Sequence, residues 1–451
     1  MSGPVEPARA LAAFLARHGA PRRLGVAVSG GGDSMALLVL AAEIPGVVLR
    51  AVTVDHGLRP EAADEAAAVA RLCAALGIEH TVLRWDGASA GGNLQAAARR
   101  ARYALIAEWS RGLDAVLLGH TLDDQAETVL MRLARGSGVD GLSGMTEGIT
   151  RDGQRWLRPL LGLRRAVLRD VLRVRGLHWC EDPSNADRRF QRVRTRQALT
   201  MLAGLGITPE GLARTAVRLG RARRALEAQT DAALRDLAQE DRGTVLLARD
   251  ALALMPEIRD RVFARLALGL AGAEHRPRLQ GLQRWIASAS GRGGPFMGCL
   301  LRPEGAGFRL FREANAVGSL SAPATGLWDG RWRVTMMPPG AAPDGLQLRA
   351  LGEPGLHRLS EQSRDGLHPH WRSTGLPRAA LAAMPALWQG ARLIAAPLAL
   401  WPNGWQIAAQ PILPVEASTL TMCSAAEEGR GRSVEEGQSI IALNTPRGSL
   451  F

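Results

Sequence analysis

A glycine-rich loop near the amino terminus has the residue types that bind phosphate. A short apolar run over 25–29 leads into a predicted helix through Ser29, Gly30, Gly31, Gly32, Asp33 and Ser34. Backbone N–H groups at such a helix start attract anions, because the helix dipole is positive there. The serine hydroxyls add hydrogen bonds, and Asp33 is a candidate ligand for Mg²⁺ bound to phosphates. A dinucleotide-binding fingerprint would need a third glycine where Met35 stands, so we favour a nucleotide phosphate site.

Two carboxylates, Asp123 and Glu127, are four residues apart and therefore share one face of a predicted helix. This helix follows a predicted strand, and open α/β sheets bind ligands at the carboxyl ends of their strands. The pair could hold Mg²⁺ or the ammonium groups of an amino acid. The alternative is ordinary acidic placement at a helix start, with Thr121 as the N-cap. His56 and His120 follow strands at the same edge, and phosphate contact, acid–base chemistry and a structural role all stay open for them.

The elements that must position these residues alternate along the first 180 residues. Apolar runs predict strands, and Ala-, Leu- and Arg-rich stretches predict helices after them, which favours a doubly wound α/β fold with a parallel sheet. The predicted strands are 25–29, 47–54, 80–85 and 115–119, and the predicted helices are 33–42, 60–76, 94–111 and 123–135. Leu11, Phe14 and Leu15 fit one face of a further short helix before the first strand.

The remainder of the chain changes character twice. From about 190 to 315 the pattern is helical, with few strand signals, and after Pro323 it becomes short strands and turns rich in Pro, Gly and Trp. We therefore expect the parallel-sheet domain over 1–205, a helical domain over 206–320 and a smaller α+β domain over 321–422. The residues 423–451 are small, polar and Gly-rich, which predicts a disordered tail.

The positive side-chain charge of the 451-residue chain comes from arginine, with no contribution from lysine. It has 56 basic and 43 acidic residues, and no Lys. The absence of Lys excludes a Walker A loop and Schiff-base enzymes. Residues 151–225 hold 18 Arg against six acids, a net charge of +12 out of the +13 of the whole chain. Such a surface suits a polyanion, and the alternative is a solvated helical face with internal ion pairs.

Cysteine usage and hydropathy set further bounds. Cys73, Cys180, Cys299 and Cys423 are widely spaced with no CxxC, which excludes zinc ribbons and dithiol redox sites. This pattern is typical of a protein in a reducing cytoplasm. The longest apolar stretch, 391–409, is broken by Pro and Gly, so no membrane partner is expected.

The loop at 29–34 resembles the pyrophosphate loop of the N-type ATP pyrophosphatases. Further motifs follow it in order, and the set is similar to the tRNA(Ile)-lysidine synthetase family over roughly residues 20–200. These motifs lie at 54–59, 93–103, 119–128, 132–145, 158–161 and 179–185, with a weaker similarity at 375–378 and 384–397. One departure is Val193, where that family usually carries Asn.

The resemblance implies a Rossmann-like ATP pyrophosphatase fold and a ligase that forms lysidine on the wobble cytidine of CAU-anticodon tRNA(Ile). ATP is the cosubstrate, with Mg²⁺ on Asp33, and L-lysine and the tRNA are the other partners, while a homodimer is left open. The domains over 206–320 and 321–422 would contact tRNA. The residues 29–34 would bind ATP, and the catalytic candidates are Asp33, Asp123, Glu127 and Arg132. The tRNA-binding candidates are Arg99, Arg102, Arg192, Arg194 and Arg196.

Three alternative functions are considered beside this ligase. A tRNA thiolase of the same superfamily would need paired cysteines to carry sulfur, and the chain has no such motif. A non-catalytic RNA-binding protein with a nucleotide-sensing domain is separable only by turnover. A small-molecule amidotransferase would lack the basic segment and would need a glutamine-hydrolysing partner.

Overall fold

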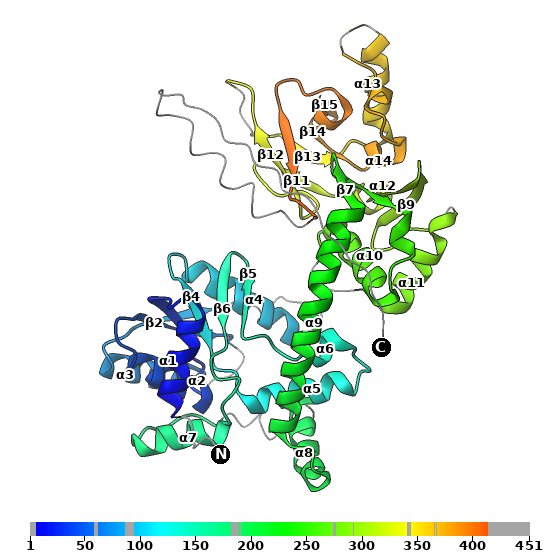
Figure 1. Cartoon of the computed structure of the whole chain (residues 1–451). Helices are drawn as coiled ribbons and strands as arrows, with labels where there is room; N and C mark the ends of the chain where they lie inside the picture. Colours follow the sequence, from blue (N-terminus) through cyan, green and yellow to red (C-terminus); the bar gives the residue numbers. More distant parts are fainter. Residues whose placement is uncertain are drawn as a thin grey trace, which may run out of the picture. The chain divides into compact units, whose positions relative to one another are not determined.

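A computed structural model describes residues 6–57, 62–85, 94–181, 189, 191–273, 277–291, 293–340, 344–364, 366 and 368–413. The predicted tail over 423–451 and the motif residues 58–59, 93 and 182–185 lie outside these ranges. The chain divides into two compact units, Met1–Ala228 and Gln229–Phe451, which we describe separately as unit 1 and unit 2 (Figure 1).

Unit 1 is built on a six-stranded sheet with the order β3-β2-β1-β4-β6-β5. The first five strands in this order pair in parallel, and β5 pairs antiparallel to β6 at the edge. The strands are β1 (Arg23–Ala27), β2 (Val48–Asp55), β3 (Glu79–Arg84), β4 (Ala115–Leu118), β5 (Gly148–Arg151) and β6 (Gln154–Leu157). The sequence predicted the first four strands and the doubly wound sheet, and these predictions are confirmed.

The helices of unit 1 follow the strands as the alternating pattern predicts. They are α1 (Pro7–Arg17), α2 (Gly32–Ala42), α3 (Ala62–Ala75), α4 (Leu94–Trp109), α5 (Leu122–Leu133), α6 (Val139–Leu142), α7 (Arg165–Val174) and α8 (Gln191–Leu202). The long helix α9 (Pro209–Leu237) begins in unit 1 and ends in unit 2. Leu11, Phe14 and Leu15 form the buried face of α1, as their spacing predicts.

Strand residues alternate between two cores, because successive side chains of a strand point to opposite faces. Ala115 and Leu117 of β4 pack in one core with residues of α1, α2, α3 and α7. Val116 and Leu118 pack in the other core with Tyr103 and other residues of α4. The sheet is therefore covered by helices on both faces, as continuous apolar strands require.

The hairpin of β5 and β6 was not predicted, although the sequence carries a signal for it. Asp152 and Gly153 both adopt positive φ, at 53° and 72°, and join the two strands. An Asp-Gly pair between strands is typical of a type I′ hairpin turn. β5 is only four residues long and has a single large apolar residue, Ile149, which hid the strand from a search for apolar runs.

Unit 2 combines three sheets with short helices. A four-stranded antiparallel sheet has the order β7-β8-β10-β9, a second has the order β11-β13-β14-β15, and β12 pairs with β16. The strands are β7 (Ala238–Asp241), β8 (Thr244–Ala248), β9 (Cys299–Glu304), β10 (Gly307–Arg312), β11 (Ser321–Pro323), β12 (Trp332–Met336), β13 (Gln347–Ala350), β14 (Pro385–Gln389), β15 (Arg392–Ala395) and β16 (Gln406–Ala409). The helices are α10 (Pro256–Ala271), α11 (Leu279–Ala287), α12 (Ala314–Val317), α13 (Gly352–Arg364) and α14 (Arg378–Ala382).

The stretch expected to be helical is so in α9, α10 and α11, but it also contains the four strands of the first antiparallel sheet. These strands are four to six residues long and are joined as hairpins β7–β8 and β9–β10. The two hairpins are joined by the pairing of β8 with β10, about 60 residues further along the chain, and no local pattern reveals that pairing. Among the described residues, no helix is both long enough and apolar enough to cross a membrane.

Candidate active site

The glycine-rich loop connects β1 to α2 and is closed by its second serine. Ser34 Oγ donates to Gly31 O at 2.9 Å and accepts from Ser29 N at 3.1 Å. Gly30 has φ of +80°, a conformation that favours glycine. The amino end of α2 leaves its first N–H groups without intrahelical acceptors. The predicted phosphate-binding residues therefore lie together at a helix amino terminus.

Two distant segments pack against this loop. Cys180 N donates to Gly30 O at 3.0 Å, and the Trp179 ring lies so close to Gly32 that a Cβ there would be 3.2 Å from it. At the end of β4, a Cβ on Gly119 would lie 3.1 Å from both Ser34 N and Ser34 Cα. The glycines at 32 and 119 thus allow the close approach that shapes the loop.

The carboxylates of the α2 and α5 amino ends are joined by one guanidinium group. Arg165 Nε donates to Asp33 Oδ2 at 2.8 Å, and Arg165 Nη2 donates to Asp124 Oδ1 at 2.9 Å. The backbone N–H of Arg165 donates to Asp123 Oδ2 at 2.7 Å, and Arg164 Nε donates to Asp123 Oδ1 at 3.1 Å. Asp33 and Asp123 were predicted to lie at one edge of the sheet, and the structure brings them together through Arg164 and Arg165.

Asp124 has a structural role as well. Thr121 is the N-cap of α5, and Asp124 completes a capping box by accepting from Thr121 N at 2.8 Å. Burial would raise the pKa of Asp124, but Arg165 and the hydrogen bonds from Thr121 outweigh it and lower the pKa below its ordinary value. The capping alternative is therefore correct for Asp124, while Asp123 faces the arginines.

Glu127 is buried, with 1% of its surface exposed. Its Oε1 accepts from Arg196 Nε at 2.9 Å and lies 3.8 Å from Arg165 Nη1. Its Oε2 is buried and has no hydrogen-bond partner. Burial raises the pKa of Glu127 above its ordinary value, although the charge of Arg196 opposes this effect. Burial also raises the pKa of Asp33, and there Arg165 opposes the effect. Glu127 therefore presents one unsatisfied acceptor to this edge of the sheet.

Arg164 and Arg165 are not among the predicted site residues, although the sequence carries a signal for them. Arg164 is the N-cap of α7 and Arg165 is its first residue, with no acid in the first turn. Positive charge at a helix amino end is unfavourable unless another group compensates it. Two arginines at a predicted helix start thus indicate carboxylate partners elsewhere in the fold.

A second cluster, of basic residues, surrounds His120. The pKa of His120 is lowered to about 4, chiefly by burial and also by Arg158, Arg102 and Arg192, against the opposing effect of Asp124. Burial also lowers the pKa of His56, with Arg102 adding to the effect. The Nδ1 atoms of both histidines are buried without a hydrogen-bond partner, so neither is a fully satisfied core histidine. This cluster offers cationic groups and neutral imidazoles at the same sheet edge.

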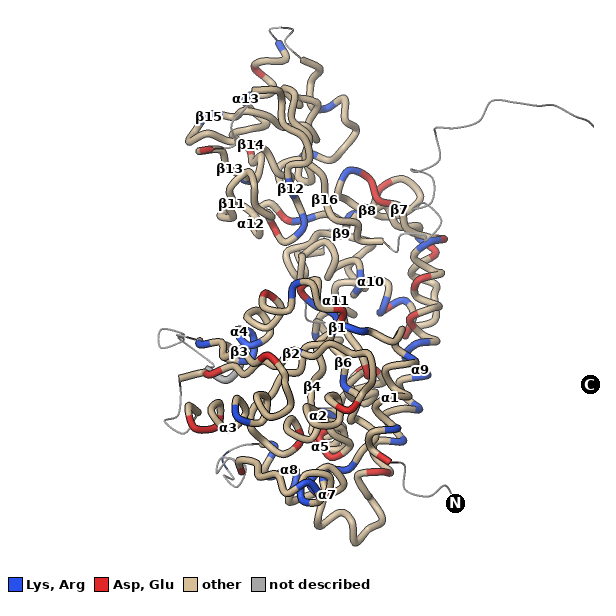
Figure 2. The backbone as a smooth tube through the Cα atoms, turned by 90° about the vertical axis from the view of Figure 1, so that its left-hand side faces the viewer, with Lys and Arg blue, Asp and Glu red and all other residues tan. Residues whose placement is uncertain are grey.

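The remaining predicted residues are distributed around these clusters. The guanidinium of Arg99 lies 5.3 Å from the ring centroid of Tyr103, and that of Arg102 lies 5.7 Å from it. Arg132 is not among the carboxylates: its Nη1 donates to Gly141 O at 2.8 Å and to Gly144 O at 3.0 Å. Arg194 donates to Arg189 O, and basic positions continue along α7, α8 and α9 (Figure 2).

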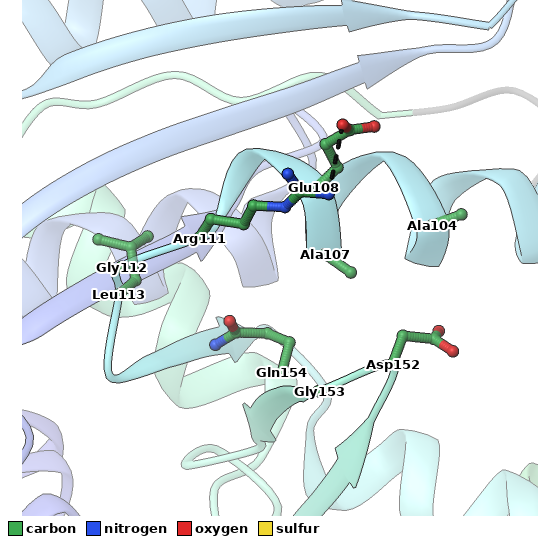
Figure 3. A pocket seen from close by; sticks show the side chains of 9 residues that line it. All are labelled: Ala104, Ala107, Glu108, Arg111, Gly112, Leu113, Asp152, Gly153 and Gln154. Atoms are coloured by element: carbon green, nitrogen blue, oxygen red, sulfur yellow. Dashed lines mark ion pairs between the residues drawn. The ribbon is translucent and has the colours of Figure 1, made fainter. Parts of the chain in front are cut away.

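A hollow of about 600 Å³ lies away from this chemistry. It is formed by the end of α4 and the β5–β6 turn, with Glu108, Arg111, Asp152 and Gln154 on its walls (Figure 3). Leu113, just before β4, and Gln154, at the start of β6, place it at the amino ends of the parallel strands. The glycine-rich loop lies at the carboxyl ends, so this hollow is not part of the candidate site. In the described part of the chain, no group of three or more His, Cys, Asp or Glu side chains could hold a metal ion by itself.

The parallel sheet, the serine- and glycine-rich loop and the adjoining carboxylates define a PP-loop domain, and the model of the PP-loop domain family matches residues 5–203. A tRNA(Ile)-lysidine synthase from Ruegeria pomeroyi is 47% identical over 392 residues, which cover 85% of this chain and 90% of that one. Another from Rhodopseudomonas palustris is 48% identical over 264 residues, 56% of this chain and 76% of that one. The chain belongs to the tRNA(Ile)-lysidine synthase family.

Among solved structures, a U34-tRNA thiolase from Methanococcus maripaludis with a [4Fe-4S] cluster matches with a TM-score of 0.41 and 20% identity. The match covers 48% of this chain and 78% of that one.

Proposed function

We propose that this protein ligates free L-lysine to C2 of the wobble cytidine in CAU-anticodon tRNA(Ile), with consumption of ATP. In the first step the C2 carbonyl oxygen attacks the α-phosphorus of ATP, and pyrophosphate leaves. In the second step the lysine amine attacks C2, the C2–O bond to AMP breaks, and the amine loses a proton. Adenylation is needed because the carbonyl oxygen is otherwise a poor leaving group. The observation that carries the proposal is the meeting of the phosphate loop and four carboxylates at one sheet edge, in a chain of this family.

The loop residues 29–34 bind the ATP phosphates through backbone N–H groups and hydroxyls. Mg²⁺ in such sites is held by one or two carboxylates plus phosphate oxygens, which fits Asp33 at the start of α2. When bound, the ion neutralises charge on the phosphates. Arg165 donates to Asp33, so binding of Mg²⁺ to this carboxylate would exchange one cationic partner for another.

The lysine amine has a matching acceptor in Glu127. Its Oε2 is buried and unpartnered, and burial raises its pKa, so an ammonium group next to it would satisfy both the oxygen and the charge. Asp123 lies at the same edge, held by Arg164 and the Arg165 N–H. Arg132 has an indirect role, because its side chain anchors the loop at Gly141 and Gly144.

The basic residues near His120 include groups that can reach RNA. Arg192 is exposed and Arg102 is half-buried, so these two can contact RNA phosphates. Arg158 is buried and donates to Thr146 O, so its effect is on the His120 environment. The tRNA is a cytoplasmic substrate, and a cytoplasmic location is part of the proposal.

The thiolase alternative has little support in the described residues. Cys73 and Cys299 lie in cores, and burial raises the pKa of each thiol to about 11, which disfavours the reactive thiolate. Cys180 lies beside the loop, where its backbone N–H donates to Gly30 O.

The test is incubation of the protein with ATP, Mg²⁺, labelled lysine and an unmodified CAU-anticodon tRNA(Ile) transcript. We expect acid-stable label in the RNA that depends on ATP and is lost when the wobble base is changed. The Asp33→Ala variant should lose adenylation of the tRNA, and normal adenylation by this variant would refute the role of Asp33. Pyrophosphate release without lysine incorporation would retain the adenylation step and refute lysine as the nucleophile.

A further inference from the structure

A groove in unit 1 lies outside the carboxylate cluster and the phosphate loop. It has a volume of about 450 Å³ and lies where the first turns of α9 face the start of α5 and the residues 161–162. Leu122, Leu161 and Val217 provide its apolar lining, and Arg214, Arg218 and Arg221 provide its basic lining. This volume is within the range of pockets that bind small organic ligands.

The three arginines of the groove differ from most others of the basic segment. Several arginines over 151–225 are paired with acids, as in Arg164–Asp123, Arg169–Glu181, Arg175–Glu43 and Arg196–Glu127. Arg214, Arg218 and Arg221 are exposed, and within the described ranges they form no ion pair or hydrogen bond. Their guanidinium groups are therefore available to an anionic ligand.

Their spacing suits a chain of phosphates better than a single anion. Positions 214, 218 and 221 lie on one face of α9, at i, i+4 and i+7, and span about 10 Å along the helix axis. Arginine binds phosphate through a planar fork and also stacks on bases. A row of this length can contact successive phosphates of one nucleic-acid strand.

The apolar lining gives the groove a second property. Val217 is 56% exposed among the arginines, and Leu122, which is 9% exposed, lines the same groove. Apolar surface between phosphate-binding groups is what an unstacked base requires, because its faces are apolar while its backbone is charged. The one acid in the groove lining, Glu210, pairs with Arg164, so the three exposed arginines leave the groove with a positive charge that suits a polyanion.

The groove adjoins the candidate active site. Leu122 directly precedes Asp123, and Glu210 lines the groove while it pairs with Arg164. Arg164 in turn donates to Asp123 at 3.1 Å. A nucleotide in the groove is therefore connected to the carboxylates by one shared arginine.

We propose that this groove binds one nucleotide of the RNA substrate, adjacent to the base that is modified, with its base on Val217 and Leu122 and its phosphates on Arg214, Arg218 and Arg221. The proposal rests on the proposed function in that it takes the substrate to be RNA. A bound neighbour would fix the register of the anticodon loop, so that one base alone reaches the phosphate loop.

The test measures the affinity of a short RNA stem-loop with a CAU loop, by fluorescence anisotropy at several salt concentrations. Val217→Asp places a negative charge among the arginines, where it repels phosphate, and should weaken binding at least about fivefold. Arg218→Ala should lower the slope of log affinity against log salt by about 1. Single abasic substitutions in the RNA loop then locate the bound nucleotide. Removal of the base at one position should weaken binding to the wild type. The same RNA should bind the Val217→Asp variant as well as the intact RNA does.

Two variants serve as matched controls. Val174 on α7 is 86% exposed and Arg9 on α1 is exposed, and neither lines the groove. Val174→Asp and Arg9→Ala should leave affinity and salt slope unchanged. The proposal is refuted when Val217→Asp binds like Val174→Asp, or when its effect adds to that of every abasic position. Lysine incorporation by the wild type is assayed in parallel. If incorporation is normal but Val217→Asp shows no coupling to any abasic position, the groove proposal is refuted and the proposed function is retained.

Discussion

At the scale of single residues, Arg165 is the group on which the arrangement of carboxylates depends. Its side chain contacts Asp33 and Asp124 and is itself only 20% exposed. Removal of one partner from a buried ion pair leaves an uncompensated charge, so we expect Arg165→Ala to lower the free energy of unfolding by about 3 kcal/mol. Urea denaturation measures this. Arg175→Ala, which removes the more exposed pair between the end of α7 and Glu43 at the end of α2, should cost less than about 1 kcal/mol, and equal losses would contradict the interpretation.

His120 gives a second prediction at this scale, a dependence of stability on pH. Burial lowers its pKa to about 4 in the folded protein, against 6.5 in the unfolded chain. Between these values the unfolded state binds the proton and the folded state does not, so acidification from pH 7 to 5 lowers the free energy of unfolding, by no more than about 3 kcal/mol.

His120→Gln should remove this part of the pH dependence, and His357→Gln, at an exposed position, should retain it. The measurement is urea unfolding of all three proteins at pH 5 and pH 7. A wild type and a His120→Gln variant with the same pH dependence would show that the imidazole stays accessible to protons.

At the scale of elements, the sequence predicts most where a signal is local. The strands β1 to β4, the helices between them and the phosphate loop each follow from apolar runs and glycines, and the structure contains them. The pairing of Arg165 with Asp33 could not be predicted, because 132 residues separate the two side chains and no periodicity connects them. The contact of Arg132 with Gly141 and Gly144 could not be predicted for a similar reason, because a position on a helix does not reveal which loop folds back over it.

The close approach of β4 to α2 supplies the prediction for this scale. A Cβ on Gly119 would lie 3.1 Å from the Ser34 backbone at the start of α2, and backbone moves less readily than a side chain. We expect Gly119→Ala to cost about 1–3 kcal/mol of stability and to weaken binding of an ATP analogue, because the loop must shift.

Gly220 in α9 is the matched control, since no atom lies within 4 Å of a Cβ placed there. Gly220→Ala should change stability in the opposite direction, by up to about 1 kcal/mol, because alanine favours the helix. Calorimetry and titration with the analogue measure both effects. Loss of stability in Gly119→Ala without weaker binding would mean that the approach supports the fold but does not shape the loop.

At the scale of the whole molecule, the linear distribution of charge is a partial guide to binding. The segment 151–225 carries a net charge of +12, yet Asp33, Glu43, Asp123 and Glu127, all outside it, pair with its arginines. The interpretation as internal ion pairs is therefore confirmed for the arginines that pair with these acids, and binding of a polyanion stays a prediction for the others. The arginines of α7 and α8 are largely engaged within the fold, and those at the start of α9 are available. Only the three-dimensional pairing separates the two sets, because it joins residues far apart in the chain.

The two compact units each have their own hydrophobic clusters, and all the candidate active-site residues lie in unit 1. Units with separate cores unfold as separate cooperative transitions, so calorimetry of the full chain should resolve two. An ATP analogue that cannot be cleaved between the α- and β-phosphates, with Mg²⁺, should stabilise only the transition of unit 1, by about 2.7 kcal/mol at 100 times its dissociation constant. Asp33→Ala should abolish this shift and leave the other transition in place. A single transition, or an equal shift of both, would show that nucleotide binding stabilises the chain as one cooperative body.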